Sequence, residues 1–371
     1  VYAQHNYIYN QFLQLETLAR QQNSHYLNGY PAIIDIPSFV DFMLMCEISS
    51  NADAYHYSTY YHKDMNGKLR AGPIWDFDLT YGNDLFVYGF DRSKYYVWQF
   101  DDNDNTGPKY WKDLYNNATF KCYLTKRWKE LTATGQPFSL SNIYKRIDEI
   151  KTIIAEAKDR EQKRWGTVSA HDTNITGLKN WLQNRYNWLN QQLTNTSLCG
   201  NIVQPKLVIS KINYHPLATG VFAEDSLEFI EITNTGNTTV DMSGFYFREP
   251  GLVYAFAPNA SIQAGQRIFI VSNTKAFRET YRIQPFGEFT RNLSNKSHRL
   301  LLCDAFGNTI DEVKYKDEAP WDILADGQGY FLELKDLLSD NLAGENWKAS
   351  DIISGLDDEN MYGGIKIYPS E

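Results

Sequence analysis

The sequence predicts an α+β multidomain chain, in which a mainly helical domain with a short β-hairpin precedes an antiparallel β-sandwich. Before residue 200, apolar residues recur at steps of three and four, as they do on one face of a helix. After it, short alternating segments are separated by Gly, Asn, Asp and Pro, which is typical of strands joined by turns. The length of 371 residues suits two domains of ordinary size.

The helical half is predicted from four periodic segments. They cover residues 7–20, 39–46, 142–165 and 177–193. Asp35 and Pro37 give the second segment the start signal of a helix. In the last two segments Arg, Lys and Glu occupy the face opposite the apolar one, which is the usual solvated side of a helix.

The second half contains seven short segments with the alternation of strands, separated by turn residues. They are residues 207–212, 227–233, 245–247, 267–272, 299–303, 309–315 and 330–334. In the second of them, Glu228 and Ile230 share one side of the strand, and Phe229 and Glu231 share the other. At least one of the two glutamates is expected to be an edge or capping carboxylate.

The composition indicates folded domains and argues against general binding of nucleic acid. The chain has 36 Lys plus Arg against 45 Asp plus Glu, a formal net charge of −9, whereas binding to phosphates needs clustered cations. Hydrophobic residues make up 43%, which is enough for packed cores. No segment approaches the roughly 20 apolar residues of a membrane-spanning helix. The chain begins at Val1 without a signal peptide, so we expect it to be a piece of a longer protein.

The four cysteines form no Cys-x-x-Cys pair, so a zinc site with thiolate ligands is not expected. Cys46 and Cys303 lie in apolar segments and are predicted to be small core residues. Cys122 and Cys199 could form a disulfide, a pairing that their spacing does not decide.

One segment carries the pattern of a reactive site. Residues 57–62 and 69–75 are strand candidates on either side of Asn66-Gly67, the strongest short hairpin signal. A hairpin folded there brings its two ends together. Asp53, just before the first strand, should then lie near Asp76 and Asp78 at the end of the second.

Alternation along the second strand places Asp76 and Asp78 on the same side, with Phe77 opposite. Carboxylates that converge with Asp53 repel each other unless a cation or a proton joins them. Oxygen ligands of this type suit Mg²⁺, Mn²⁺ or Ca²⁺. The alternative interpretation is a surface turn flanked by solvated aspartates.

The residues around this segment resemble those of the CotH family of atypical secretory kinases. They are Asn51-Ala52-Asp53, His56, Tyr60-Tyr61, Lys63-Asp64, Gly67-Lys68, Trp75-Asp76-Phe77-Asp78 and Gly82, followed by Arg127-Trp128, Glu156-Ala157, Glu161, Arg164-Trp165, Leu178-Lys179, Trp181-Leu182, Arg185 and Trp188-Leu189. The resemblance covers about residues 1–195. It implies a kinase-like C-lobe that uses Mg²⁺ or Mn²⁺ with ATP.

The resemblance also implies a role for each matching residue. Asp53 would be the catalytic aspartate that orients or deprotonates the acceptor hydroxyl. Asp76 would bind the metal that bridges to the ATP phosphates, with Asp78 as a supporting ligand. Kinase-like loops usually carry an Asn five residues after the catalytic Asp, and here Ser58, a weaker metal ligand, stands in that place.

Only about fifty residues precede Asp53, and no Gly-rich phosphate loop is visible among them. We therefore expect this chain to be the C-lobe alone and to be inactive by itself, even if the parent protein is a kinase.

A second acidic segment has the spacing of a Ca²⁺ loop. Asp102, Asp104 and Thr106 offer oxygens at alternate positions, Gly107 follows, and Asp113 stands where such loops usually have Glu. A solvated, Asp-rich insertion is the alternative interpretation.

The β-rich half resembles a lamin-tail domain, an immunoglobulin-like sandwich that serves as a binding or attachment module in many bacterial extracellular proteins. The resemblance is carried by residues 207–213, 228–234, 241–245, 307–313, 327–334 and 346–347. Together the two resemblances imply a kinase-like C-lobe at 1–199, a linker at 200–206, the lamin-tail sandwich at 207–350 and a C-terminal tail at 351–371.

Two hypotheses of function follow. In the first, the parent protein is an extracytoplasmic kinase that transfers phosphate from Mg-ATP to Ser or Thr of a secreted or surface protein. In the second, the chain belongs to a non-catalytic surface protein, in which a pseudokinase scaffold and the sandwich bind a protein or a glycan through their many Tyr and Trp side chains. Neither hypothesis calls for nucleic acid or a membrane span in this chain.

Overall fold

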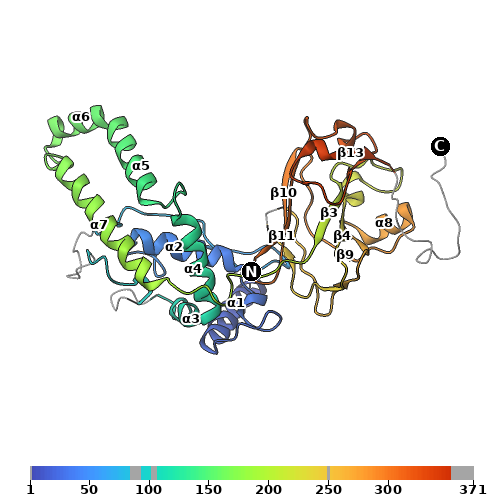
Figure 1. Cartoon of the computed structure of the whole chain (residues 1–371), viewed down its shortest axis with the longest axis horizontal. Coiled ribbons are helices and arrows are strands. Elements are labelled where there is room, and N and C mark those ends of the chain that lie inside the picture. The colour runs from blue at the N-terminus through green and yellow to red at the C-terminus, as the bar shows by residue number, and fades with distance from the viewer. Residues whose placement is uncertain (1, 84–92, 102–106, 249–250, 352–371) are drawn as a thin grey trace. The chain divides into compact units, whose positions relative to one another are not determined.

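The computed structural model describes residues 2–83, 93–101, 107–248 and 251–351 (Figure 1). By their contacts the residues group into two compact units. The first consists of residues 1–63 and 69–202, and the second of residues 64–68 and 203–371. Among the described residues the first is mainly helical and the second mainly β, so the predicted fold class is confirmed.

The helices of the first unit surround one central helix, α2 (Figure 1). Its described helices are α1 (Tyr2–Arg20), α2 (Ile36–Ser49), α3 (Tyr110–Asn116), α4 (Ala118–Thr132), α5 (Leu140–Ile153), α6 (Ala155–Trp165) and α7 (His171–Gln192). Helix α2 contacts both α4 and α7. It begins as predicted, because the Asp35 side chain accepts a hydrogen bond from the Ser38 N–H and Pro37 stands in its first turn.

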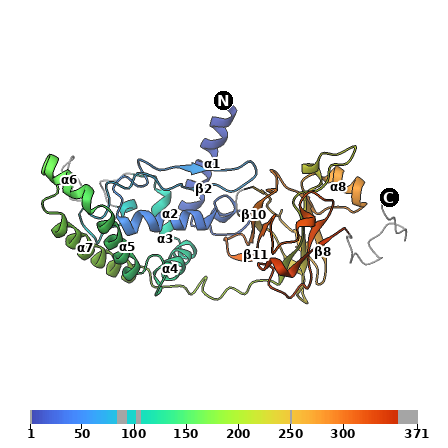
Figure 2. The ribbon, with the colours of Figure 1, turned by 90° about the horizontal axis from the view of Figure 1, so that it is seen from above.

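Several helices differ from their predicted bounds, and α7 begins at His171 instead of residue 177. The single helix expected over 142–165 is interrupted at Ile154, which ends α5 and precedes α6. Neither of these helices buries a residue. Tertiary packing therefore does not stabilise one continuous helix over two shorter ones. Helix α1 begins before the predicted start, and its first turns project from the rest of its unit (Figure 2).

The second unit is a sandwich of two sheets with the apolar core between them. Among the described residues one sheet has the order β13-β12-β3-β4-β8-β9 and the other has the order β11-β10-β6, while β5 and β7 form a separate ladder. Their bounds are β3 (Leu207–Asn213), β4 (Phe229–Asn234), β5 (Val240–Asp241), β6 (Tyr246–Phe247), β7 (Ser261–Ile262), β8 (Arg267–Val271), β9 (Gly287–Glu288), β10 (Ser297–Cys303), β11 (Thr309–Lys316), β12 (Phe331–Leu334) and β13 (Trp347–Ser350).

A second apolar layer covers the outer face of the larger sheet. Helix α8 (Thr274–Tyr281) lies there, and its Phe277 packs with Phe229, Phe269 and Phe331. Ile230 instead faces the core between the sheets. The two sides of β4 therefore alternate as the sequence predicts, and both are buried.

The structure decides which cysteines form a disulfide. Cys122 in α4 and Cys199 after α7 form a disulfide, with their Cα atoms 5.9 Å apart. Cys46 and Cys303 lie outside the disulfide and are buried, as predicted. The disulfide fastens the segment that follows α7 to the core of the first unit.

Candidate functional site

The loop after α2 and the hairpin that follows it form the candidate site. Strand β1 (Tyr61–His62) pairs antiparallel with β2 (Arg70–Ala71), so the predicted hairpin exists but is much shorter than expected. Pro73 has no N–H to continue the ladder, and Ser58 adopts a left-handed backbone that no strand accepts. The residues on either side of this short ladder are therefore free to form loops.

Left-handed backbone is concentrated in these loops. Positive φ angles occur at Ser50 (50°), Tyr55 (69°), Ser58 (44°), Asn66 (65°), Asp76 (61°) and Tyr81 (57°). Ser and Tyr favour this region poorly, whereas Asn and Asp tolerate it, and outliers of this kind cluster at functional sites. The concentration is an observation that points to a site and does not depend on the identity of the aspartates.

One buried amide joins the two loops that carry the candidate aspartates. The Asn51 side chain accepts a hydrogen bond from the Asp53 N–H (3.0 Å) and donates one to the Asp76 carbonyl (3.4 Å). The backbones of Asp53 and Asp76 thus lie on either side of a single amide group. Their proximity is what the hairpin argument predicts, although the hydrogen bonds come from Asn51.

Asp76 does not lie on a strand. Its φ of 61° places it in the left-handed region, so the alternation assumed for Asp76, Phe77 and Asp78 does not hold. Its carboxylate accepts a hydrogen bond from the Ser58 hydroxyl (3.2 Å), which brings the predicted weak ligand to the predicted metal-binding aspartate. Asp78 accepts from the Leu79 N–H (3.0 Å). Asp76 and Asp78 are exposed, and Asp53 is half-buried.

The donor set of this site is oxygen only. Among the described residues no group of three or more His, Cys, Asp or Glu gathers closely enough to hold a metal by itself. Mg²⁺ is usually held by one or two carboxylates together with waters and substrate phosphates rather than by a complete protein cage. A carboxylate paired with a hydroxyl therefore fits a nucleotide-bound Mg²⁺ or Mn²⁺ and not a protein-enclosed metal.

The proposed Ca²⁺ loop falls largely outside the described residues, because Asp102, Asp104 and Thr106 belong to segment 102–106. Asp113, its last expected ligand, lies in α3, and its carbonyl accepts a hydrogen bond from the Gln22 side chain (2.9 Å).

A buried ion pair, which sequence reasoning did not identify, lies next to the loops of the candidate site. Arg185 of α7 and Glu47 of α2 are 0% and 1% exposed, and their side chains pair at 2.9 Å. Arg185 also donates to the carbonyls of Tyr95 and Val97. Burial raises the pKa of Glu47 and lowers that of Arg185, and each is opposed by the charge of the other.

The same ion pair reaches the Asp53 loop. The Tyr55 hydroxyl donates to Glu47 (2.9 Å), and the Gln99 side chain donates to the Ser50 hydroxyl (2.8 Å). Both ends of the loop are thereby fixed. A sequence signal existed, since Glu47 lies among the apolar residues of α2 and Arg185 lies at helical spacing from the buried Leu182 and Leu189.

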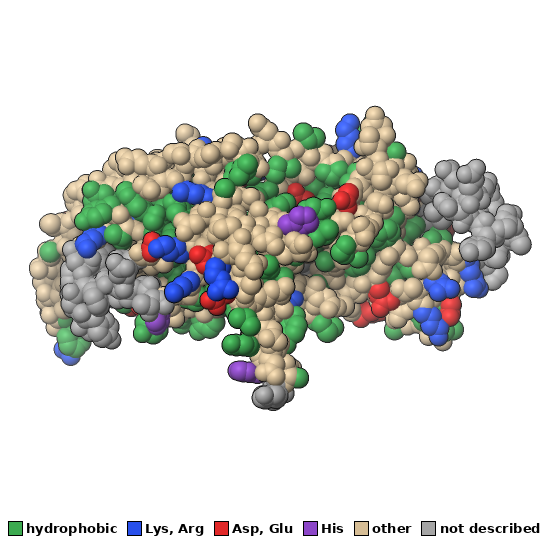
Figure 3. Space-filling model, turned by 90° about the horizontal axis from the view of Figure 1, so that it is seen from below, with side chains coloured by type: hydrophobic (Ala, Val, Ile, Leu, Met, Phe, Trp, Pro, Cys, Tyr) green, Lys and Arg blue, Asp and Glu red, His purple; other side chains and the backbone are tan. Residues whose placement is uncertain are grey.

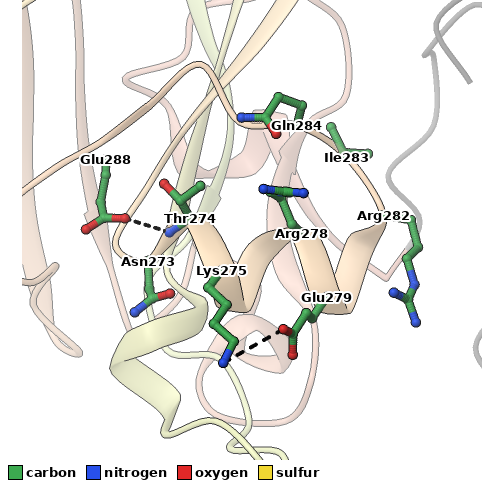
Figure 4. Close-up of a pocket in the computed structure, with 9 residues that line it drawn as sticks. All are labelled: Asn273, Thr274, Lys275, Arg278, Glu279, Arg282, Ile283, Gln284 and Glu288. Carbon is green, nitrogen blue, oxygen red and sulfur yellow. Dashed lines mark hydrogen bonds and ion pairs between the residues drawn. The ribbon is translucent and has the colours of Figure 1, made fainter. Parts of the chain in front are cut away.

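The second unit has a surface pocket of about 770 Å³ beside α8 (Figure 4). Its polar groups largely serve the helix itself: Glu288 accepts the Thr274 N–H (2.8 Å), and Lys275 pairs with Glu279 at 4.0 Å. No His, Cys or Ser lines it. Thr274, Lys275, Glu279 and Glu288 are engaged in these contacts of the helix, so the loops around Asn51 remain the candidate site.

Comparison with known proteins agrees with this division of the chain. The family model described as CotH kinase protein matches residues 2–189, about half of the chain, and the Lamin Tail Domain model matches residues 202–317. A comparison with curated proteins gave no match. The candidate loops lie inside the first match, and the sandwich contains the second. The chain therefore belongs to the CotH kinase protein family and carries a lamin-tail domain after its kinase-like part.

Proposed function

We propose that this chain supplies the metal-binding and acceptor-orienting residues of an extracytoplasmic protein kinase, which transfers phosphate from Mg-ATP to Ser or Thr of a secreted or surface protein. The observation that carries the proposal is the Asn51 amide, which bonds the backbones of Asp53 and Asp76 together. A phosphotransferase needs an acceptor-orienting carboxylate and a metal-binding carboxylate at a fixed separation.

The roles follow from the surroundings of each residue. Asp76 is exposed and is oriented by the Ser58 hydroxyl, so its carboxylate would hold the cation that neutralises phosphate charge. Asp78 stands nearby as a supporting ligand. Asp53, on the more rigid loop after α2, would orient the acceptor hydroxyl and accept its proton.

An extracytoplasmic location is supported by the Cys122–Cys199 disulfide, because such bonds persist mainly in oxidising compartments. None of the described helices has the length and apolar character that a membrane crossing requires. The lamin-tail sandwich would serve as an attachment or binding module for the same protein.

A second candidate function is a non-catalytic scaffold that binds a protein or a surface glycan. It is favoured by Ser58 at a position where kinase-like loops usually have Asn, and by exposed aromatic rings beside the loops. Tyr57, Tyr60 and Trp75 are 63%, 51% and 59% exposed. Such rings provide contact area for a partner at low entropic cost.

Titration with Mn²⁺ separates the two functions. We expect saturable binding, measured by the relaxation of water protons, that is lost in Asp76→Asn and weakened in Asp78→Asn. Asp148→Asn is the matched control, because Asp148 is a 60% exposed aspartate on α5 and should leave binding unchanged. If the wild-type chain binds no Mn²⁺, or if binding survives Asp76→Asn, the scaffold is the better description.

A further inference from the structure

We propose that Asn51 is the positioning residue that holds the Asp53 loop and the Asp76 loop in register. The proposal deepens the proposed function, since it concerns the residues of the same site. It assigns the geometry of that site to a buried side chain next to the two candidate aspartates.

The two loops run side by side through backbone hydrogen bonds. The Tyr81 N–H donates to the Ser49 carbonyl (2.6 Å), and the Ala52 N–H donates to the Leu79 carbonyl (3.2 Å). These two bonds involve Tyr81 and Leu79. The Asn51 side chain extends the pairing to Asp76 itself.

Every polar group of Asn51 is engaged. Its N–H donates to the Cys46 carbonyl (2.9 Å), and its carbonyl accepts from Ala54 (3.2 Å). Its amide oxygen and nitrogen bond the Asp53 N–H and the Asp76 carbonyl. With the residue only 2% exposed, water cannot replace these partners, so their loss leaves buried groups unsatisfied.

The position needs a short side chain that accepts and donates at the same time, and Asn meets this requirement. Aspartate has the same shape and still accepts from the Asp53 N–H, but it cannot donate to the Asp76 carbonyl and sets a negative charge against it. Alanine removes both bonds. The two substitutions therefore separate the bond to Asp76 from the bond to Asp53.

Hydrogen exchange in the metal-free chain tests the proposal directly. In Asn51→Ala and in Asn51→Asp we expect amides of residues 76–81 to exchange at least about fivefold faster, the effect of one lost hydrogen bond. Asn117→Ala is the matched control, because Asn117 is also buried and bonds Thr119, Phe120 and Tyr30 at the start of α4. It should accelerate exchange near α4 alone. Unchanged exchange over 76–81 in both Asn51 variants would overturn the proposal.

The affinity for Mn²⁺ gives a second test, because a positioning role and a net-charge effect of Asn51→Asp change it in opposite directions. If Asn51 positions Asp76, Asn51→Asp weakens Mn²⁺ binding about fivefold in spite of its added negative charge. If net charge alone sets the affinity, the same substitution tightens binding, and the positioning role is refuted. Should the wild-type chain bind no Mn²⁺, the proposed function fails, and the exchange experiment by itself decides the role of Asn51.

Discussion

At the scale of single residues, the second unit contains a buried carboxyl group, Glu228, with one unsatisfied oxygen among the described residues. Glu228 is 0% exposed, and one of its oxygens accepts the Leu293 N–H (3.0 Å). The other oxygen has no hydrogen-bond partner among the described residues. Burial, with Asp225 and Glu224 nearby, raises the pKa of Glu228 to about 8. This carboxyl group is therefore mostly protonated at neutral pH, and its role as an edge or capping group stays a prediction.

The stability of the sandwich should fall as pH rises through 8. The folded pKa of Glu228 is raised, so its contribution is present in full below the unfolded pKa and is lost as the folded carboxyl ionises. Between pH 6.5 and pH 9 we expect a loss on the order of 2 kcal/mol in the free energy of unfolding. Glu228→Gln should remove this loss, since the amide has the same shape and does not ionise.

Urea unfolding, followed by labelling of the Cys303 thiol, reports on this unit, because Cys303 is a buried thiol outside the disulfide. Peptide mass spectrometry distinguishes it from Cys46 in the other unit. Glu318→Gln is the control, since Glu318 is 67% exposed and should keep the wild-type pH dependence. An unaltered slope in Glu228→Gln would contradict the assignment.

Residue-level prediction from sequence succeeded where the local pattern decides the environment. Cys46 and Cys303 are buried because they lie within apolar segments of α2 and β10. The orientation of Asp76 was predicted wrongly, because its left-handed backbone depends on contacts with Ser58 and Asn51 that local spacing does not encode.

At the scale of elements, the buried ion pair of Glu47 on α2 and Arg185 on α7 links two helices. Removing one partner of a buried pair leaves the other charge buried and uncompensated. We expect Arg185→Leu to lower the free energy of unfolding of the first unit by about 3–5 kcal/mol. Labelling of Cys46 in urea measures it.

Two further variants check this explanation. Arg146 pairs with Glu149 on α5 and is 67% exposed, so Arg146→Leu should change stability by less than about 0.5 kcal/mol. Adding Glu47→Gln to Arg185→Leu should recover part of the loss, because no buried charge is then left unpaired. A double variant that is less stable than Arg185→Leu alone would show that packing, and not charge, dominates.

The disulfide is the second link between elements. Cys122 and Cys199 are 77 residues apart, and closing a loop of that length in the unfolded chain is worth about 4 kcal/mol in the chain-entropy model. The double variant Cys122→Ser with Cys199→Ser should therefore unfold at a lower urea concentration, measured again by the labelling of Cys46. Reduction of the wild-type chain should produce the same shift. Equal urea midpoints of unfolding for the double variant and the oxidised wild type would contradict the prediction.

Elements were predicted where their local signals were strong, whereas α4 lies outside the periodic segments predicted as helices in spite of its 15 residues. Asp35 and Pro37 predict the start of helix α2. Alternation predicts the longer strands β3, β10 and β11. Helix α8 was not predicted, although Asn273 caps it, because its eight residues carry too short a pattern. The ladder of β5 and β7, with two residues in each strand, exists through tertiary pairing and has no periodicity to detect.

At the scale of the whole molecule, the change of apolar period near residue 200 identified where the helical part gives way to the sandwich, because period reflects how each layer buries its apolar side. The matched families end and begin at 189 and 202. The proposed active site was less accessible to such reasoning. It depends on long-range bonds of Asn51, Glu47 and Arg185, which only the folded chain displays.

The surface of α1 shows one more feature that composition does not reveal. Its first turns project from the helical unit (Figures 2 and 3), and Tyr7, Ile8, Tyr9 and Leu13 are about half exposed or more, with Ile8 at 56%. Apolar side chains on a projecting helix are covered poorly by their own unit. The helical unit thus presents apolar surface that its own described residues do not bury.

We expect residues 1–371 by themselves to show no measurable transfer of phosphate from Mg-ATP or Mn-ATP to Ser or Thr. In the proposed function Asp76 with Ser58 would hold a metal and Asp53 would orient an acceptor, but the residues before Asp53 include no Gly-rich phosphate loop. ATP would then bind in many poses, and loss of in-line positioning forfeits about 7–11 kcal/mol of barrier reduction. A kinase assay with either metal, set beside Asp76→Ala, measures this. Robust transfer that disappears in Asp76→Ala would mean that another part of this chain positions the phosphates.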